Sequence, residues 1–196
     1  MAKKTDAASP PAGLTRTFAL AVPIADDDGR TWSEITLREP ELRDQASMQR
    51  GKTTTANERS ARHIAELSGV PDIAVRRLKL RDARVIQAWL KSLNTEAMKH
   101  APVEMGDGSH TFELLAPVTT NAGAVTHITL REPDIDTGIA VEKAGGDTVA
   151  QATAAMIAAL SDISVPVAMR LSVRDVTVME TWLGFFSPPG EDEAAA

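Results

Sequence analysis

The sequence predicts an α+β fold made of two tandem modules, each an antiparallel β-hairpin followed by helices in the order ββααα. The strongest indication is a repeat. Ile-Thr-Leu-Arg-Glu-Pro occupies residues 35–40 and returns at residues 128–133, a shift of 93. With that shift and no gap, 19 of the 56 residues from 35 to 90 are identical in the second copy, against about 4 expected by chance from ordinary composition. The second indication is that both copies show strand-like and helix-like patterns in the same order. We infer a duplicated domain, since the period is too long for a solenoid repeat.

Each copy opens with two strand-like segments joined by a turn. In the first segment, apolar residues alternate with smaller or polar ones, at Phe18, Leu20, Val22 and Ile24 and again at Phe112, Leu114, Ala116 and Val118. Asp-Asp-Asp-Gly at 26–29 and Asn-Ala-Gly at 121–123 are typical hairpin turns. The return segments place Ile35 and Leu37, or Ile128 and Leu130, on one face. Each copy therefore predicts a β-hairpin.

Helices are expected after each Glu-Pro. They cover about 41–50 and 56–68 in copy one, about 134–143 and 147–160 in copy two, and a short segment from 71 or 164. The last helix of each copy has the clearest pattern, because its apolar residues form one stripe: Val85, Ile86, Trp89, Leu90 and Leu93, repeated as Val178, Met179, Trp182, Leu183 and Phe186. We interpret Trp89 and Trp182 as core anchors and Asp82 and Asp175 as N-caps.

These patterns define a first module at residues 14–94 and a second module at residues 110–187, joined by a linker at 95–109. Small and polar residues predict a disordered lead at 1–13 and a disordered acidic tail at 188–196. Packing of the modules about a pseudo-two-fold axis would join the two hairpins into one four-stranded sheet.

Composition narrows the class of protein. The chain of 196 residues is 43% hydrophobic and 24% charged, which is typical of a soluble globular protein, and no apolar run is long enough for a membrane span. It has no cysteine, which excludes disulfides and thiolate chemistry. Residues 1–100 carry 17 Lys and Arg against 13 Asp and Glu, a net +4, whereas residues 101–196 carry 4 against 14, a net −10. Two interpretations of this difference in net charge are open. It serves solubility alone, or it makes the two copies attract each other or bind different partners.

The repeated corner is the motif that most resembles an active site. Arg38, Glu39 and Pro40 follow a strand, as do Arg131, Glu132 and Pro133. We interpret it as a fixed strand-to-helix corner with an ion pair, since no nucleophile or second base recurs near it. The four histidines lack metal-ligand spacing, and there is no glycine-rich phosphate loop. We therefore expect no catalytic residue, no metal and no cofactor.

Two surfaces are candidates for binding a partner. The helix over residues 148–160 is nearly all apolar or small, so it must be covered by copy one or by an external partner, and its candidate residues are Val149, Ala152, Met156 and Ile157. Arg76 and Arg77 begin a basic cluster that copy two lacks. With 4% aromatic residues and a net charge of −6, the chain fits a protein partner better than a nucleic acid.

Three motifs in order resemble a known family: Ile-Thr-Leu-Arg-Glu-Pro, then Ile-Ala-Glu-Leu-Ser-Gly-Val-Pro at 64–71, then Leu-x-Leu-Arg-Asp at 78–82. Together they are similar to the tail assembly chaperones of Mu-like, contractile-tailed phages. The resemblance covers residues 18–93, and copy two matches more loosely, since Gly69 becomes Asp162 and Pro71 becomes Ser164. The family is usually a single short module, so a tandem form departs from its pattern.

The resemblance implies a non-catalytic protein of the infected bacterial cytoplasm that is absent from the mature virion. Its implied partners are the tape measure protein, which it would keep soluble, and the tail tube protein; self-association is also considered. A structural tail or baseplate component is the first alternative, and a nucleic-acid-associated regulator is the second. No membrane role is expected.

Overall fold

The computed structural model describes residues 13–50, 55–104, 108–144 and 146–186, so the predicted tail and all of the predicted lead except Gly13 lie outside the described residues. The first module holds β1 (Thr15–Ala25), β2 (Thr31–Arg38), α1 (Leu42–Arg50), α2 (Ala56–Ser68), α3 (Asp72–Val75) and α4 (Leu80–Ala97). A 3-10 turn (Met98–His100) leads to β3 (Ser109–Thr120), β4 (Gly123–Arg131), α5 (Ile135–Ala144), α6 (Val149–Leu160), α7 (Val165–Ala168) and α8 (Val173–Gly184). The predicted α+β fold with two hairpins, each followed by helices, is confirmed.

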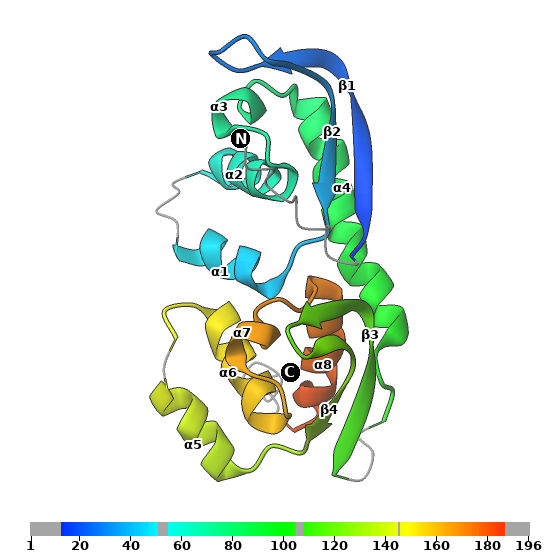
Figure 1. Cartoon of the computed structure of the whole chain (residues 1–196), viewed down its shortest axis with the longest axis vertical. Helices are drawn as coiled ribbons and strands as arrows, with labels where there is room; N and C mark the ends of the chain where they lie inside the picture. Colours follow the sequence, from blue (N-terminus) through cyan, green and yellow to red (C-terminus); the bar gives the residue numbers. More distant parts are fainter. Residues whose placement is uncertain (1–12, 51–54, 105–107, 145, 187–196) are drawn as a thin grey trace, which may run out of the picture.

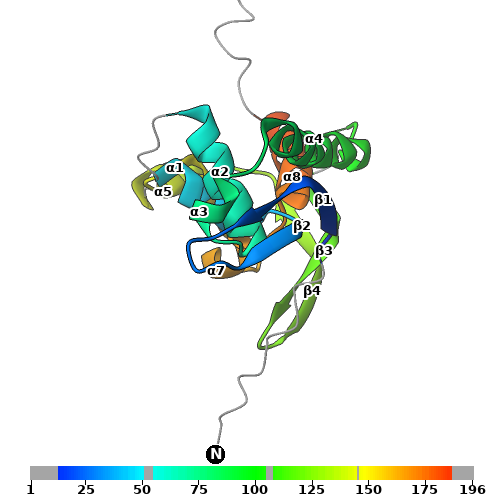
Figure 2. The same cartoon turned by 90° about the horizontal axis from the view of Figure 1, so that it is seen from above.

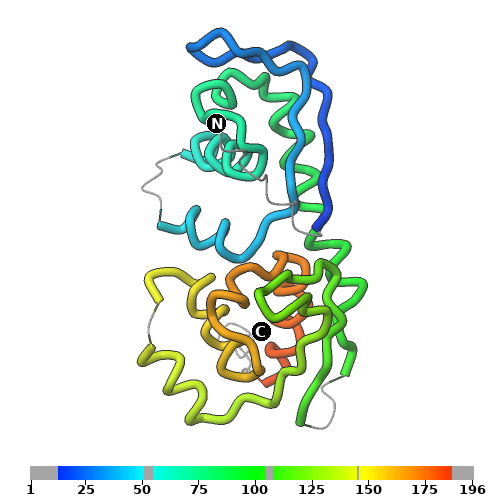
Figure 3. Tube along the Cα trace, in the orientation of Figure 1, coloured from blue at the N-terminus to red at the C-terminus, as the bar shows by residue number. Residues whose placement is uncertain are grey.

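The two hairpins do not form one sheet. Within the described residues, β1 pairs only with β2 and β3 only with β4, so the four-stranded sheet considered from the sequence is wrong. The modules are instead stacked along the long axis with both hairpins on one side (Figure 1). The first-module helix α1 lies against the second module, whereas its counterpart α5 lies at the far end of the molecule (Figures 1 and 3). This head-to-tail arrangement differs from a two-fold axis, which would bring equivalent surfaces together.

Each hairpin contains a bulge at an equivalent place, between Ala19 and Ile24 and between Glu113 and Val118. A bulge leaves backbone N–H groups outside the ladder. The carboxylate of Asp82 accepts a hydrogen bond from Ala21 N at 3.2 Å. Asp175 accepts from Leu115 N at 2.6 Å and from Ala116 N at 3.2 Å.

The predicted N-cap role of these two aspartates is therefore wrong. α8 begins one turn earlier, with Ser172 as the cap whose Oγ accepts from Asp175 N, and α4 follows Lys79. The aspartates lie in the first turn of each helix, where their charge is favourable. Their carboxylates reach across to the bulged strand and tie the last helix of each module to its hairpin.

Two apolar cores lie between the hairpins and the helices. Trp89 packs edge to face on Phe18 at 5.6 Å between ring centroids, and Trp182 packs likewise on Phe112 at 6.0 Å, so both tryptophans lie where the stripe predicts. The second core, however, also contains Leu42, Ala46 and Ala97 from the first half of the chain. α4 runs through the start of the predicted linker and reaches α8, as Figure 2 shows from above.

The middle helices have well-defined ends. Thr55 forms a capping box with Glu58 before α2, which ends at Gly69 with φ +70°, a left-handed conformation that favours glycine. Thr148 caps α6, and its side chain accepts a hydrogen bond from Gln151 N. Copy two has Asp162 in place of Gly69, and α6 ends at an extended residue, Ser161. The loss of glycine there is matched by a different helix terminus.

Candidate functional site: the contact between the modules and an open groove

The Leu-Arg-Glu-Pro corner of the first module is held by a buried carboxylate. Arg38 donates two hydrogen bonds of 2.7 Å to Asp44, a bidentate pair. Asp44 also accepts from Glu41 N at 2.7 Å. The hydrogen bond to Asp44 raises the pKa of Arg38, so this guanidinium stays charged. The corner is rigid because Asp44 satisfies both the arginine and the first turn of α1.

Glu39 connects the two modules. Its carboxylate accepts from Arg174 Nε at 2.5 Å and from Arg174 Nη2 at 2.9 Å, and it also accepts from Leu14 N at 3.1 Å. The side chains of Arg174 and Glu39 are only 11% and 2% exposed. The hydrogen bond to Glu39 raises the pKa of Arg174. The sequence predicts an ion pair at the corner, but its partners come from elsewhere in the chain: Asp44 for Arg38, and Arg174 for Glu39.

Backbone hydrogen bonds extend this contact. Leu42 N donates to Leu171 O at 2.9 Å, Arg43 N to Met169 O at 2.8 Å, and Val173 N to Pro40 O at 2.9 Å. Val173 lies at the start of α8, where helical N–H groups need outside acceptors. The chain after the corner therefore adds backbone pairing to the entry of α8.

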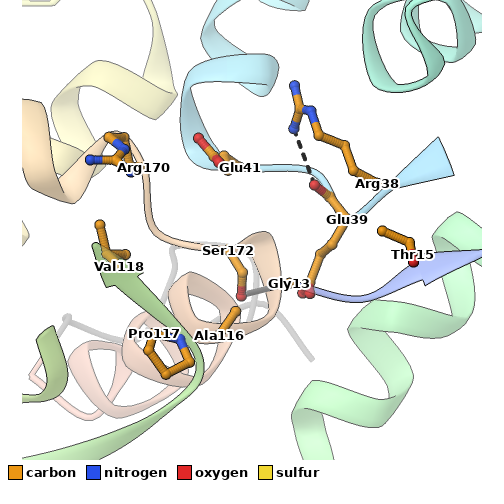
Figure 4. Close-up of a pocket in the computed structure, with 10 residues that line it drawn as sticks. All are labelled: Gly13, Thr15, Arg38, Glu39, Glu41, Ala116, Pro117, Val118, Arg170 and Ser172. Atoms are coloured by element: carbon orange, nitrogen blue, oxygen red, sulfur yellow. Dashed lines mark hydrogen bonds between the residues drawn. The ribbon is translucent and has the colours of Figure 1, made fainter. Parts of the chain in front are cut away.

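A small cavity of about 30 Å³ lies at this junction, lined by residues of both modules that include Gly13, Thr15, Glu41, Pro117 and Arg170 (Figure 4). Its volume suits a water molecule rather than a ligand. Burial raises the pKa of Glu41, opposed by Arg43, whose Nε lies 2.6 Å from the Glu41 carboxylate. The junction is therefore a structural contact.

α1 covers the apolar helix of the second module. Leu42 and Ala46 are 0% and 2% exposed in its core, and Gln49 Oε1 accepts from Ala150 N at 3.2 Å at the first turn of α6. The sequence left open whether copy one or an external partner covers this helix. In the structure, α1 of copy one packs against it. Among the candidate residues, Ile157 is fully buried, Ala152 and Met156 are half-buried, and Val149 is 71% exposed.

Among the described residues, no other module packs against the same corner of the second module. Arg131 donates to Ala159 O at 2.8 Å instead of to a carboxylate, because Thr137 replaces Asp44. Glu132 and Pro133, the counterparts of Glu39 and Pro40, are exposed and half-buried, whereas Glu39 and Pro40 are buried. In the part of the chain that the structure describes, the first copy of the motif makes a contact between modules and the second copy does not.

A larger groove opens on the first module between α2, α3 and α4. It has a volume of about 440 Å³, and Ala61, Leu78 and Leu80 contribute apolar lining while Arg76 and Arg84 contribute charge. Arg76 pairs with Asp72 at 2.6 Å. Arg77 does not line the groove; it donates to Asp27 and to Ala25 O, both at 2.6 Å, and so fastens the β1–β2 turn to the helices.

Sequence reasoning missed the groove and the part played by Asp44. The groove is lined by residues from three separate helices, and no periodicity in one segment reports such a space. The role of Asp44 could have been suspected from the sequence, because an acidic residue in the first turn after the corner is a natural partner for Arg38. Among the described residues, no group of three or more His, Cys, Asp or Glu is placed to hold a metal ion.

Comparison with known proteins relates the first module to a family. Residues 17–94 match the family described as phage tail assembly chaperone proteins, E, or 41 or 14. The match runs from β1 to α4, which is the first module. The first module is therefore similar to the phage tail assembly chaperone family, as the three motifs predict. No curated protein and no solved structure matches the chain.

Proposed function

We propose that this chain is a non-catalytic tail assembly chaperone that binds the tape measure protein in the cytoplasm of the infected host and assists assembly of the tail tube around it. The family match of the first module carries the proposal. A tape measure is a long helical protein, and apolar helical stripes of that kind aggregate unless a partner covers them. In the part of the chain that the structure describes, no helix is long and apolar enough to cross a membrane.

The outer face of α6 is the client surface in this proposal. Val149, Ala152 and Met156 lie three or four residues apart and form one stripe of the helix. Ala150, Ala154 and Ile157 of α6 are buried in the second core, which α1 also enters. Val149 is 71% exposed and Ala152 and Met156 are half-buried, so a client helix can reach this stripe. The corresponding residues of α2 are Ala56, Arg59 and His63, so the apolar stripe belongs to the second module alone.

Co-expression with the tape measure protein of the same phage tests the proposal. The tape measure should be recovered in the soluble fraction with this chain and should precipitate without it. Val149→Glu should reduce the soluble yield severalfold, because it puts a charge in the stripe at an exposed position that the fold tolerates. Val103→Glu is the matched control, since Val103 is 90% exposed outside the stripe.

An unchanged soluble yield with and without this chain would contradict chaperone activity, and equal yields for the two variants would contradict the α6 surface. The structural alternative is tested on purified virions. A chaperone should be absent from them, and detection of this chain there by mass spectrometry would favour a tail or baseplate component.

A further inference from the structure

The contact between α1 and the second module has two sides, and each side has an equivalent surface elsewhere in the molecule. Among the described residues, neither of these equivalent surfaces is covered in the same way. Residues 93 apart occupy equivalent places in the two modules, so α5 corresponds to α1 on the donor side. On the acceptor side, the α2–α4 groove of the first module corresponds to α6 and the chain from Met169 to Val173, which the corner and α1 contact in the second module. The repeat therefore provides two copies of the interface, and the described residues of one chain form one of them.

On the donor side, α5 exposes the residues that α1 buries. Leu42 is 0% exposed and its counterpart Ile135 is 82% exposed. Ala46 is 2% exposed and its counterpart Ile139 is 41% exposed. Both positions became isoleucine in the copy that lacks a cover, which is opposite to the change expected for a surface that stays in water.

On the acceptor side, the groove exposes the residues that the second module buries. Val173 is 7% exposed under the contact, whereas its counterpart Leu80 is 62% exposed. Leu171 is fully buried, whereas its counterpart Leu78 is half-buried in the groove lining. The lining of the groove, which has a volume of about 440 Å³, includes Asn57, Leu78 and Leu80. Their counterparts in the second module, Ala150, Leu171 and Val173, are hydrogen-bonded to Gln49, Leu42 and Pro40.

The charges of α5 and of the α2–α4 groove are complementary. The ion pair between Glu39 and Arg174 has the counterparts Glu132, which is exposed, and Arg81, whose side chain is 65% exposed. The hydrogen bond from Ala150 N to Gln49 would become one from Asn57 N to Glu142. The groove lies in the half of the chain with net charge +4, and α5 lies in the half with net charge −10. Opposite charges favour the meeting of these two halves in different molecules.

We propose that copies of this chain associate head to tail, with α5 of one copy seated in the α2–α4 groove of the next and Glu132 paired with Arg81. The occupant of the groove is thus a second copy of this chain. Because the groove lies among helices of the first module and α5 lies at the far end of the second module (Figure 1), the contact is heterologous and can add further copies in series. The proposal does not depend on the client, since it concerns the purified chain alone.

Sedimentation of the purified full-length chain over a wide concentration range tests the proposal. The wild-type chain should form species larger than a dimer whose mass rises with concentration, and high salt should weaken them. Ile135→Glu and Leu80→Glu should each remain monomeric, because each puts a charge into one side of the contact at an exposed position. Val103→Glu should assemble like the wild type, and circular dichroism checks that every variant is folded.

Mixing the two defective variants separates head-to-tail association from other modes. Ile135→Glu retains the groove and Leu80→Glu retains α5, so an equimolar mixture should form a one-to-one heterodimer and nothing larger. In the same way, Glu132→Arg and Arg81→Glu should each weaken assembly, and the double variant should restore it. A monomeric wild type at every concentration, a wild-type mass that stops at a dimer, or a variant mixture that stays monomeric would overturn the proposal.

Discussion

The two modules share a scaffold but differ in what surrounds their corners. In the first, Glu39 is buried against Arg174 of the second module, while in the second, Glu132 lies exposed. The motif is identical, so the difference is one of context: a glutamate becomes part of a buried ion pair only where another module supplies the arginine. A repeated motif can therefore mark a repeated interface rather than a repeated catalytic site.

The largest expected effect compares the two tryptophans. Trp182→Ala should lower the free energy of unfolding by about 3–5 kcal/mol, since Trp182 is fully buried between Phe112 and Phe186. Trp89→Ala should cost less, because Trp89 keeps 8% of its surface exposed. Urea denaturation measures both values. Because α1 and α4 of the first module enter the second core, we expect a single transition in the wild type; two separate transitions would contradict coupling of the modules.

The second comparison is between Arg174 and Arg81, which lie in the first turns of α8 and α4. Arg174→Ala should lower the free energy of unfolding by about 3 kcal/mol, because it leaves the carboxylate of Glu39 buried without its cation. Arg81→Ala should change it by less than about 0.5 kcal/mol in the monomer, since Arg81 is exposed. Thermal unfolding at low protein concentration measures both. Equal losses of unfolding free energy in the two variants would contradict a stabilising role for the ion pair between Arg174 and Glu39.

A smaller effect is expected at the aspartates that hold the bulges. Asp175→Ala should cost about 2 kcal/mol, because Leu115 N and Ala116 N lose their buried acceptor. Asp82→Ala should cost about 1 kcal/mol or less, since it accepts a single exposed hydrogen bond of 3.2 Å in the structure. Amide hydrogen exchange of β3 and β1 in the two variants reports the loss locally. Faster exchange in β1 than in β3 would reverse this comparison.

The smallest effect is a pH dependence that belongs to the first module. Burial lowers the pKa of His63 below its ordinary value of 6.5, with Asp44 opposing and Arg38 reinforcing the shift. The unfolded chain then binds a proton that the folded chain does not, so stability falls as the pH drops below 6.5 toward the lowered pKa. Denaturation midpoints across this range should fall less steeply in His63→Gln than in the wild type. His127→Gln, in the second module, serves as the control; an identical slope in His63→Gln and the wild type would refute the assignment.

Much of each module could be predicted from its own segment. The alternation from Phe18 to Ile24 predicts a strand, and the spacing of Val85, Trp89 and Leu93 predicts a helix with one buried face. The three family motifs, at residues 35–40, 64–71 and 78–82, are likewise short segments that can be read from the sequence of the first module. Asp82 and Asp175 are not the N-caps that the sequence predicts, because the N-cap positions are Lys79 and Ser172, three residues earlier. A carboxylate in the first turn of a helix resembles a cap in the local sequence.

The sequence by itself determined the repeat, the hairpins, the tryptophan-bearing helices and the charge difference between the halves, because each arises from neighbouring residues or from a fixed shift. Only the tertiary structure decided that α1 leaves its own module to cover α6, that Glu39 meets Arg174, and that the equivalent groove on the first module stays open. These features depend on how two similar bodies are placed relative to each other. That placement is set by side chains 101 to 135 residues apart in the chain, and no local pattern records it.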